Sequence, residues 1–201
     1  RSGRGMIVLG LTGSIGMGKS EAAAGLAVRG VPVFEADAEV HHLLAKDPAV
    51  ISEVGSEFPK CISRGILDRM RLANTVWGND SALDRLEAIL HPRVFERADR
   101  FLILAEAGGA ACVVLEMPLL MESGASELCD AVAVLSAPAA VQEARVLGRP
   151  EMNSARLAFV RQRQMSEAEK RARADYVVDS GSGVISMLDQ LVGILDGLVA
   201  A

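Results

Sequence analysis

Residues 6–20 read Met6-Ile7-Val8-Leu9-Gly10-Leu11-Thr12-Gly13-Ser14-Ile15-Gly16-Met17-Gly18-Lys19-Ser20. The apolar first half of this stretch predicts a buried strand, and residues 13–20 fit the phosphate-loop pattern G-x-x-x-x-G-K-[ST]. An Ala-rich segment follows, and we expect it to form a helix from about Lys19 to Val28. A glycine-rich turn can match so short a pattern by chance, but the strand before it and the helix after it supply the context that a nucleoside triphosphate site needs.

Each part of this loop suits a chain of phosphates. Glycine adopts backbone angles that are closed to other residues, so Gly13, Gly16 and Gly18 allow successive N–H groups to turn inward. Lys19 would add a positive charge near the β- and γ-phosphates, Ser20 a hydroxyl near Mg²⁺, and the helix its positive end at the same place. The residues predicted to contact the triphosphate are Gly13, Ser14, Ile15, Gly16, Met17, Gly18, Lys19, Ser20 and Glu21.

The bulk composition limits the classes of protein that remain. The chain has 201 residues, half of them apolar, which suits one domain with insertions. We expect a cytosolic protein without membrane contact, because no segment has the form of a signal peptide or the roughly 18 apolar residues of a membrane span. A formal net charge of -5 and few aromatic residues argue against nucleic-acid binding. The expected partner is a small-molecule substrate.

Four further apolar runs alternate with helical patterns along the chain. They are Val31–Phe34, Ala111–Leu115, Ala131–Leu135 and Tyr176–Val178. Because strands that are separated by helices pair in parallel, the sequence predicts an α/β fold with a five-stranded parallel sheet and helices on both faces. The phosphate loop should then lie at the carboxyl ends of the strands.

Two regions outside this sheet are predicted to be helical. The segment Ala38–Ala107 contains no convincing strand, and glycines and prolines divide it into a helical insertion. Its expected breaks are Pro48, Gly55, Pro59, Gly65, Gly78 and Pro92. Later, a helix over Ala140–Leu147, a break at residues 148–150 and an arginine-rich helical stretch over Ser154–Arg173 are typical of a lid. The apolar spacing over Val184–Leu198 predicts a last helix that packs against the sheet.

A phosphate loop alone does not distinguish kinases from switches, motors and transporters. The chain lacks the D-x-x-G and [NT]-K-x-D motifs of GTPase switches, and its length leaves little room for the transmission elements of a motor. These observations favour a small-molecule kinase.

A kinase needs a group that orients or deprotonates the acceptor hydroxyl. Asp37 follows the second predicted strand, at the sheet edge where the loop should lie, and we predict that it is the general base. Glu35 could do this instead or assist Mg²⁺, while the alternative for both acids is to cap the next helix. Glu116 stands where an acid could reach Mg²⁺ or its water shell. Beyond it, Pro118-Leu119-Leu120 would form an apolar wall of the acceptor pocket.

Phosphoryl transfer also needs cations that neutralise the transferring group. Arg145 and Arg149 are four residues apart and could reach the phosphates as a lid closes, so we predict that both are catalytic. The alternative is an exposed helix face without a function. Basic residues concentrate in this part of the chain: Arg145, Arg149, Arg156, Arg161, Arg163, Lys170, Arg171 and Arg173.

These residues belong to segments that resemble the dephospho-CoA kinase family along nearly the whole chain. The pair His91-Pro92 and the segment Pro118-Leu119-Leu120 are more specific to that family than the phosphate loop is. The family-like segments are Gly10–Ser20, Val31–Asp37, Gly65–Arg69 with Leu72-Ala73, Leu86–Val94, Met117–Glu122, and Gln164–Ser166 leading through Lys170 to Ala174–Asp179.

The resemblance implies that the chain phosphorylates the ribose 3′-hydroxyl of dephospho-CoA, the last step of coenzyme A synthesis, with ATP as donor and Mg²⁺ as cofactor. It also implies three regions. A P-loop nucleotide-binding core would comprise residues 6–37, 108–147 and 174–201, a helical dephospho-CoA-binding region residues 38–107, and an arginine-bearing lid residues 148–173.

Roles carry over by position. Asp37 is the base, Lys19 and Ser20 keep their roles in the loop, and Arg145 and Arg149 fall on the lid. Arg69 and His91 belong to the acceptor side, although the residues alone favour a structural role for His91 ahead of Pro92. The substrate-binding set is therefore Asp37, Arg69, His91, Pro118 and Leu119.

The chain departs from the family pattern at five positions without losing a charged group from the proposed chemistry. They are Ser14, Met17, Glu21, Glu35 and Ser180. Glu21 replaces a frequent threonine, so its expected contact with the α-phosphate is through its backbone N–H. Two other functions stay open on the residues alone: a kinase of a nucleoside monophosphate or small polyol, and a regulator that binds nucleotide and signals through its lid without transfer.

Overall fold

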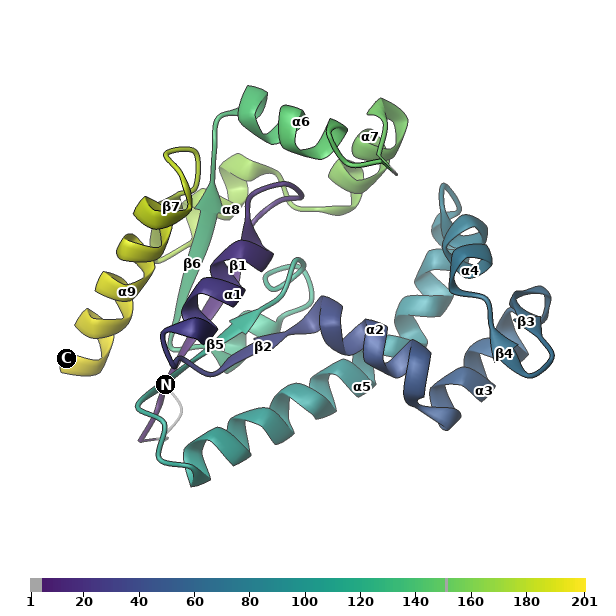
Figure 1. The fold of residues 1–201 in the computed structure, drawn as a ribbon, viewed down its shortest axis with the longest axis horizontal. Helices are drawn as coiled ribbons and strands as arrows, with labels where there is room; N and C mark the ends of the chain where they lie inside the picture. Colours follow the sequence, from purple (N-terminus) through teal and green to yellow (C-terminus); the bar gives the residue numbers. More distant parts are fainter. Residues whose placement is uncertain (1–4, 151) are drawn as a thin grey trace. The chain divides into compact units, whose positions relative to one another are not determined.

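The structure is a computed structural model that describes residues 5–150 and 152–201. The chain forms two compact units (Figure 1). The sheet unit comprises Arg1–Glu35 with Leu102–Ala201, and the helical unit comprises Ala36–Phe101. No helix in the described part of the chain combines the length and the apolar character that crossing a bilayer requires.

The sheet unit is built on five parallel strands, as the apolar runs predict. Their order across the sheet is β2-β5-β1-β6-β7, so the phosphate-loop strand β1 is central and pairs with β5 and β6. The strands are β1 (Ile7–Thr12), β2 (Val33–Glu35), β5 (Cys112–Glu116), β6 (Ala131–Ser136) and β7 (Tyr176–Asp179).

The two faces of β1 have different neighbours because side chains alternate along a strand. Leu9 and Leu11 are fully buried in the cluster that contains residues of α1 (Lys19–Val28) and α9 (Val184–Ala200). On the other face, a Cβ atom at Gly10 would lie 2.6 Å from Leu120 Cδ2. Glycine therefore lets the segment after β5 approach the strand closely, and β1 is covered on both sides.

The arginine-rich stretch after β6 contains more breaks than the sequence pattern predicts. Helix α6 (Ala139–Leu147) agrees with expectation, but the helix expected over Ser154–Arg173 is two helices, α7 (Ser154–Arg163) and α8 (Glu167–Arg173). Ser166 caps α8 through a reciprocal pair of hydrogen bonds with Glu169. This S-x-x-E capping box starts a new helix and explains the break at residues 164–166.

The helical unit contains α2 (Ala36–Lys46), α3 (Pro48–Glu57), η1 (Pro59–Cys61), α4 (Arg69–Val76) and most of α5 (Asp80–Ala107), whose residues from Leu102 onward belong to the sheet unit. It also contains a small antiparallel hairpin of β3 (Ile62–Ser63) and β4 (Ile66–Leu67), where no strand was predicted. Gly65, with a φ of 78°, supplies the left-handed turn of that hairpin.

Two expected breaks in this unit are absent. Gly55 lies inside α3 and Pro92 inside α5. Proline removes the one hydrogen bond that its nitrogen would donate to Ala88 O, four residues earlier. Buried residues on both sides, such as Leu90 and Val94, pack the helix on either side of that missing bond. A pattern that treats proline as a stop does not record this packing.

Candidate active site

The loop between β1 and α1 has the backbone that its glycines predict. Gly16 and Gly18 have φ values of 80° and 86°, in the left-handed region, and Gly18 is the N-cap residue of α1. A Cβ atom at Gly16 would lie 2.5 Å from Val146 Cγ2, so α6 packs directly on the loop. Glycine is thus required at Gly16 both for the backbone angle and for the close approach of a helix.

The first turn of α1 brings the predicted phosphate ligands together at one helix N-terminus. Lys19, Ser20 and Glu21 are its first three residues, and the positive end of the helix adds to the lysine charge. Lys19 Nζ donates to Gly13 O at 3.0 Å, so the side chain folds back over the loop. The arrangement can bind a polyphosphate through backbone N–H groups, an ammonium group and a hydroxyl.

Side chains from the lid segment hold the first half of the loop. Ser14 Oγ donates to Glu167 Oε2 at 3.1 Å, and Ile15 N donates to Gln164 Oε1 at 3.1 Å. Ile15 O accepts from Gln142 Nε2 of α6 at 2.8 Å, and the buried Gln142 amide in turn accepts from Arg161. The loop is therefore hydrogen-bonded to Gln142 of α6, to Gln164 in the break between α7 and α8, and to Glu167 at the start of α8. We call these three residues the clamp.

An open cavity of about 260 Å³ lies beside the loop in the sheet unit. It is lined by Gly16, Gly18, Glu21, Arg145, Arg149, Ser180, Val184 and Met187. Arg145 Nη2 donates to Ser180 O at 2.7 Å, and Arg145 Nη1 lies 3.5 Å from Gly16 O. Arg149, just beyond α6, is exposed. Both predicted arginines thus line the cavity, one fixed by backbone carbonyls and the other open to solvent.

The turn after β7 borders this cavity through Ser180. Asp179 Oδ1 accepts from Gly181 N at 2.8 Å, and its other oxygen accepts from the Ser182 hydroxyl. The Ser182 hydrogen bond, followed by the Gly181 N–H group and the charge of Arg145, lowers the pKa of Asp179 below its ordinary value. The carboxylate form therefore stabilises the turn that positions Ser180.

Two acids meet at the carboxyl ends of neighbouring strands. Glu116, the last residue of β5, is 2% exposed and pairs in register with Glu35 of β2 and Leu11 of β1. Glu35 is half-buried. The strand order therefore places both carboxylates at the sheet edge from which the phosphate loop starts, as the sequence predicts.

The remaining predicted site residues belong to the helical unit or to the segment after β5. Asp37 is the second residue of α2 and is exposed, in the first turn rather than at a capping position. Arg69 is the first residue of α4 and exposed, and His91 is half-buried within α5. Pro118 and Leu119 directly follow β5 and are half-buried. The predicted residues therefore divide between the two units.

Several polar residues that contact the loop or the segment after β5 had no individual role predicted, among them Gln142, Gln164, Lys170 and Glu122. Gln142 and Gln164 bind the backbone of Ile15, and Lys170 and Glu122 form an ion pair with an Nζ–Oε1 distance of 3.0 Å. Gln164, Lys170 and Glu122 all lie in segments that resemble the family, which was the available signal. Their partners are distant in the sequence, so no local pattern identifies them.

Comparison with known proteins agrees with this geometry. The family model of dephospho-CoA kinase matches residues 7–185. The dephospho-CoA kinase of Brucella melitensis is 45% identical over 193 residues, which cover 96% of this chain and 96% of the relative. The dephospho-CoA kinase of Mesorhizobium japonicum is 44% identical over 193 residues, which cover 96% of this chain and 97% of the relative. A Thermus thermophilus crystal structure aligns with a TM-score of 0.77 and 34% identity, covering 96% of this chain and 98% of the other.

The dephospho-CoA kinase of Campylobacter jejuni, at 19% identity, supports the fold alone, with a TM-score of 0.64 and coverage of 98% of this chain and 100% of the other. The family match spans most of the residues that build the loop, the cavity and the helical unit, and the relatives align over nearly their whole length. The chain belongs to the dephospho-CoA kinase family.

Proposed function

We propose that the residues described above carry out the family reaction, in which ATP phosphorylates the ribose 3′-hydroxyl of dephospho-CoA to give coenzyme A and ADP. In this assignment the 3′-oxygen attacks the γ-phosphorus, the bond to the β–γ bridging oxygen breaks, and ADP leaves. The Asp37 carboxylate accepts the hydroxyl proton. The observation that carries the proposal is the glycine loop beside an open cavity that two arginines line.

The phosphate loop binds the triphosphate in this proposal. Backbone N–H groups of residues 13–21 surround the phosphates, apart from Ile15 N and Met17 N, which donate to Gln164 Oε1 and Ser14 O. Lys19 neutralises charge on the β- and γ-phosphates. The clamp formed by Gln142, Gln164 and Glu167 supports this role, because it fixes the loop before the ligand arrives. Such preorganisation reduces the entropy that binding must remove.

Both arginines are predicted from the sequence to be catalytic; in this proposal Arg149 keeps that role and Arg145 instead binds the nucleotide. Arg145 is bound to Ser180 O and lies beside Gly16, so its planar guanidinium forms a fixed wall of the cavity, which suits contact with the nucleotide base. Arg149 is exposed beyond the end of α6, which suits a side chain that reaches the transferring phosphoryl group when the lid closes. Arg145→Ala should therefore raise KM for ATP, and Arg149→Ala should mainly lower kcat.

A magnesium ion fits the donors at this edge. Within residues 5–150 and 152–201, no three His, Cys, Asp or Glu side chains gather into a metal cage. Mg²⁺ does not need one, because it usually keeps several waters and binds one or two protein oxygens together with substrate phosphates. Ser20 at the start of α1 would hold it, with Glu116 or Glu35 reaching its water shell. The ion would supply positive charge against the β- and γ-phosphates.

The acceptor contacts are Asp37, Arg69, His91, Pro118 and Leu119. Pro118 and Leu119 offer an apolar surface, Arg69 a cation for the phosphates of dephospho-CoA, and His91 a hydrogen-bonding ring. The exposed Asp37 carboxylate forms no hydrogen bond with any described residue, so it is available to a hydroxyl.

The test is ADP release from Mg²⁺-ATP with dephospho-CoA, AMP, adenosine or no acceptor, and identification of coenzyme A by mass. Turnover with dephospho-CoA alone is the expected result. ADP release with AMP or adenosine at a similar rate would contradict the acceptor assignment. ATP binding without release in any arm would favour a regulator that binds nucleotide without transfer.

A further inference from the structure

Lys170 of α8 carries a fully buried ammonium group. Its exposed fraction is 0%, and its Nζ donates to Pro118 O at 3.0 Å and lies 3.0 Å from Glu122 Oε1. A lysine charge is rarely removed from water without partners, because its desolvation is costly. Both of these partners come from the short segment that follows β5, so one ammonium group of α8 binds that segment at two points.

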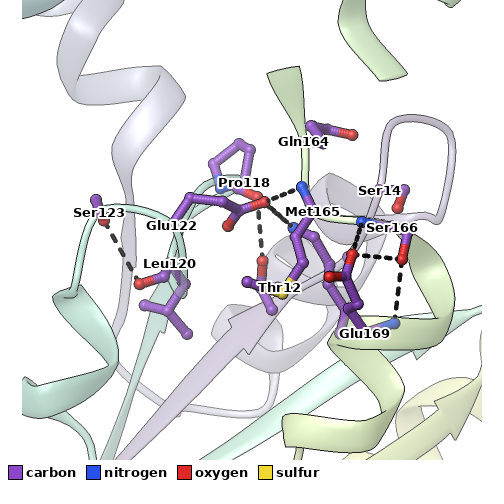
Figure 2. A network of polar contacts seen from close by, with 12 residues as sticks. Thr12, Ser14, Pro118, Leu120, Glu122, Ser123, Gln164, Met165, Ser166 and Glu169 are labelled. Carbon is purple, nitrogen blue, oxygen red and sulfur yellow. Dashed lines mark hydrogen bonds and ion pairs between the residues drawn. The ribbon is translucent and has the colours of Figure 1, made fainter. Parts of the chain in front are cut away.

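The Pro118 carbonyl also fastens the segment to the central strand. Its oxygen accepts a second hydrogen bond from Thr12 Oγ1 at 3.2 Å (Figure 2). Thr12 is the last residue of β1 and immediately precedes Gly13 of the phosphate loop. One residue earlier, Met117 N donates to Leu11 O at 3.1 Å. The Pro118 carbonyl, at the start of the segment after β5, therefore accepts hydrogen bonds both from Thr12, next to the phosphate loop, and from Lys170.

Glu122 extends the connection to the break between α7 and α8. The Glu122 Oε1 atom that faces Lys170 also accepts from Met165 N at 2.8 Å, as Figure 2 shows. The neighbouring Gln164 accepts from Ile15 N of the loop. A continuous set of contacts therefore runs from the loop through the break at residues 164–166 to Glu122, Lys170 and Pro118, and back to Thr12. All of these residues belong to the sheet unit.

We propose that Lys170 is a positioning residue for phosphoryl transfer, which acts by holding the Pro118–Glu122 segment and the break between α7 and α8 in a fixed register with the phosphate loop. This inference rests on the proposed function, because Pro118 and Leu119 are assigned there to the acceptor. Transfer requires the acceptor oxygen and the γ-phosphorus to be aligned, and a displacement of about 1 Å can lower the rate roughly 100-fold. A charged donor to Pro118 O restrains that displacement.

A purely structural role for the pair predicts different behaviour. Lys170→Met leaves Glu122 without its cation, and this should lower the melting temperature whatever the role of Lys170. Adding Glu122→Gln removes the unpaired charge, and the new amide oxygen can still accept from Met165 N. The melting temperature should then recover. If the Lys170–Glu122 ion pair only stabilises the fold, activity should recover together with the melting temperature. If Lys170 positions the segment, activity should stay low, because Pro118 O still lacks its charged donor.

The experiment measures kcat, KM for both substrates, the ATP dissociation constant and the melting temperature in the full-length chain. We expect Lys170→Met and the double variant Lys170→Met/Glu122→Gln to lose kcat roughly 10- to 100-fold, with an ATP dissociation constant within about threefold of the unmodified enzyme. The double variant should melt close to the unmodified enzyme. Lys60→Met, which removes an exposed lysine of η1, is the matched control and should change neither kcat nor the melting temperature.

Thr12→Val gives a second route that leaves every charge in place. It removes the other donor to Pro118 O from a fully buried position while keeping a similar shape. A lower kcat at an unchanged melting temperature is expected, and its effect should not add to that of Lys170→Met, because both act on one carbonyl. If Lys170→Met does not fold, the kcat of Thr12→Val alone tests the inference.

Full kcat in the double variant together with full kcat in Thr12→Val would overturn the inference. Absence of turnover with dephospho-CoA in the unmodified enzyme would instead refute the proposed function, so the two failures are distinguished before any variant is compared.

Discussion

Asp37 is two residues beyond the end of β2 and in the first turn of α2. Its carboxylate interacts favourably with the helix dipole whatever its chemical role. If it is the base, Asp37→Asn should lower kcat by about two to four decades, because the amide cannot accept the hydroxyl proton, and should leave nucleotide affinity nearly unchanged. Steady-state kinetics and isothermal titration with ATP measure the two quantities.

Glu39 is the matched control for Asp37, because it lies in the same first turn. Glu39→Gln removes a similar charge from the helix terminus and should keep kcat within about threefold of the unmodified enzyme. Equal losses of kcat in both variants would mean that the turn needs negative charge rather than a base at Asp37.

The Asp179 carboxyl provides a prediction about pH. The Ser182 hydroxyl, the Gly181 N–H group and Arg145 lower its pKa in the folded state. The stabilisation is therefore complete above the pKa of the unfolded chain and is lost as the pH falls through the lower folded-state pKa. In Ser182→Ala, the pKa of Asp179 should rise toward its ordinary value, and NMR titration of the carboxyl carbon measures this. An unchanged pKa would show that the hydroxyl does not stabilise the carboxylate.

At the scale of elements, Gly16 joins the phosphate loop to α6. Gly16→Ala forces a side chain onto a left-handed backbone and into Val146, so the loop and α6 must separate. We expect a large loss of ATP affinity and a lower melting temperature. Gly30→Ala is the control: its φ of 83° is similar, but a Cβ atom there would meet nothing within 4 Å. Equal losses of ATP affinity in the two variants would show that backbone strain alone, and not contact with α6, is responsible.

The segment 148–173 is predicted to be a lid, and closure should change its exposure. Arg161 and Arg163, in the last turn of α7 just before the break at residues 164–166, offer sites for trypsin, which cleaves after Arg and Lys in locally unfolded segments. ATP with dephospho-CoA should slow cleavage in this segment, as peptide mass mapping can follow, while cleavage after Arg29 near the end of α1 serves as the internal reference. Equal cleavage with and without ligands would contradict closure.

Elements of the sheet were predictable because buried parallel strands produce apolar runs, as at Cys112–Glu116, between segments with helical spacing. The phosphate loop was predictable because its chemistry requires glycines at fixed spacing. The continuation of α5 through Pro92 was not, since it goes with buried packing on both sides of the proline, as at Leu90 and Val94, which a local pattern does not record. The contact between Lys170 and Pro118 was not predictable either, because it joins residues 52 positions apart that only the fold brings together.

At the scale of the whole molecule, nucleotide binding should appear as a gain in stability. ATP at 100 times its dissociation constant adds about 2.7 kcal/mol to the free energy of unfolding. For a chain of this length that corresponds to a rise in melting temperature of roughly 5 to 10 °C. Lys19→Ala should lose most of the rise, because the charge directed at the phosphates is gone. A full rise in that variant, measured by differential scanning calorimetry, would contradict the role of the loop.

The most direct test of the central claim is the position of the new phosphate. The enzyme is incubated with ATP and either dephospho-CoA or its 3′-deoxyribose analogue, and the products are identified by ³¹P NMR and mass spectrometry. Transfer to the ribose 3′-oxygen predicts coenzyme A from the first acceptor and no phosphorylated product from the second. Phosphorylation of the 3′-deoxy analogue, or a product phosphorylated at another position, would contradict the account.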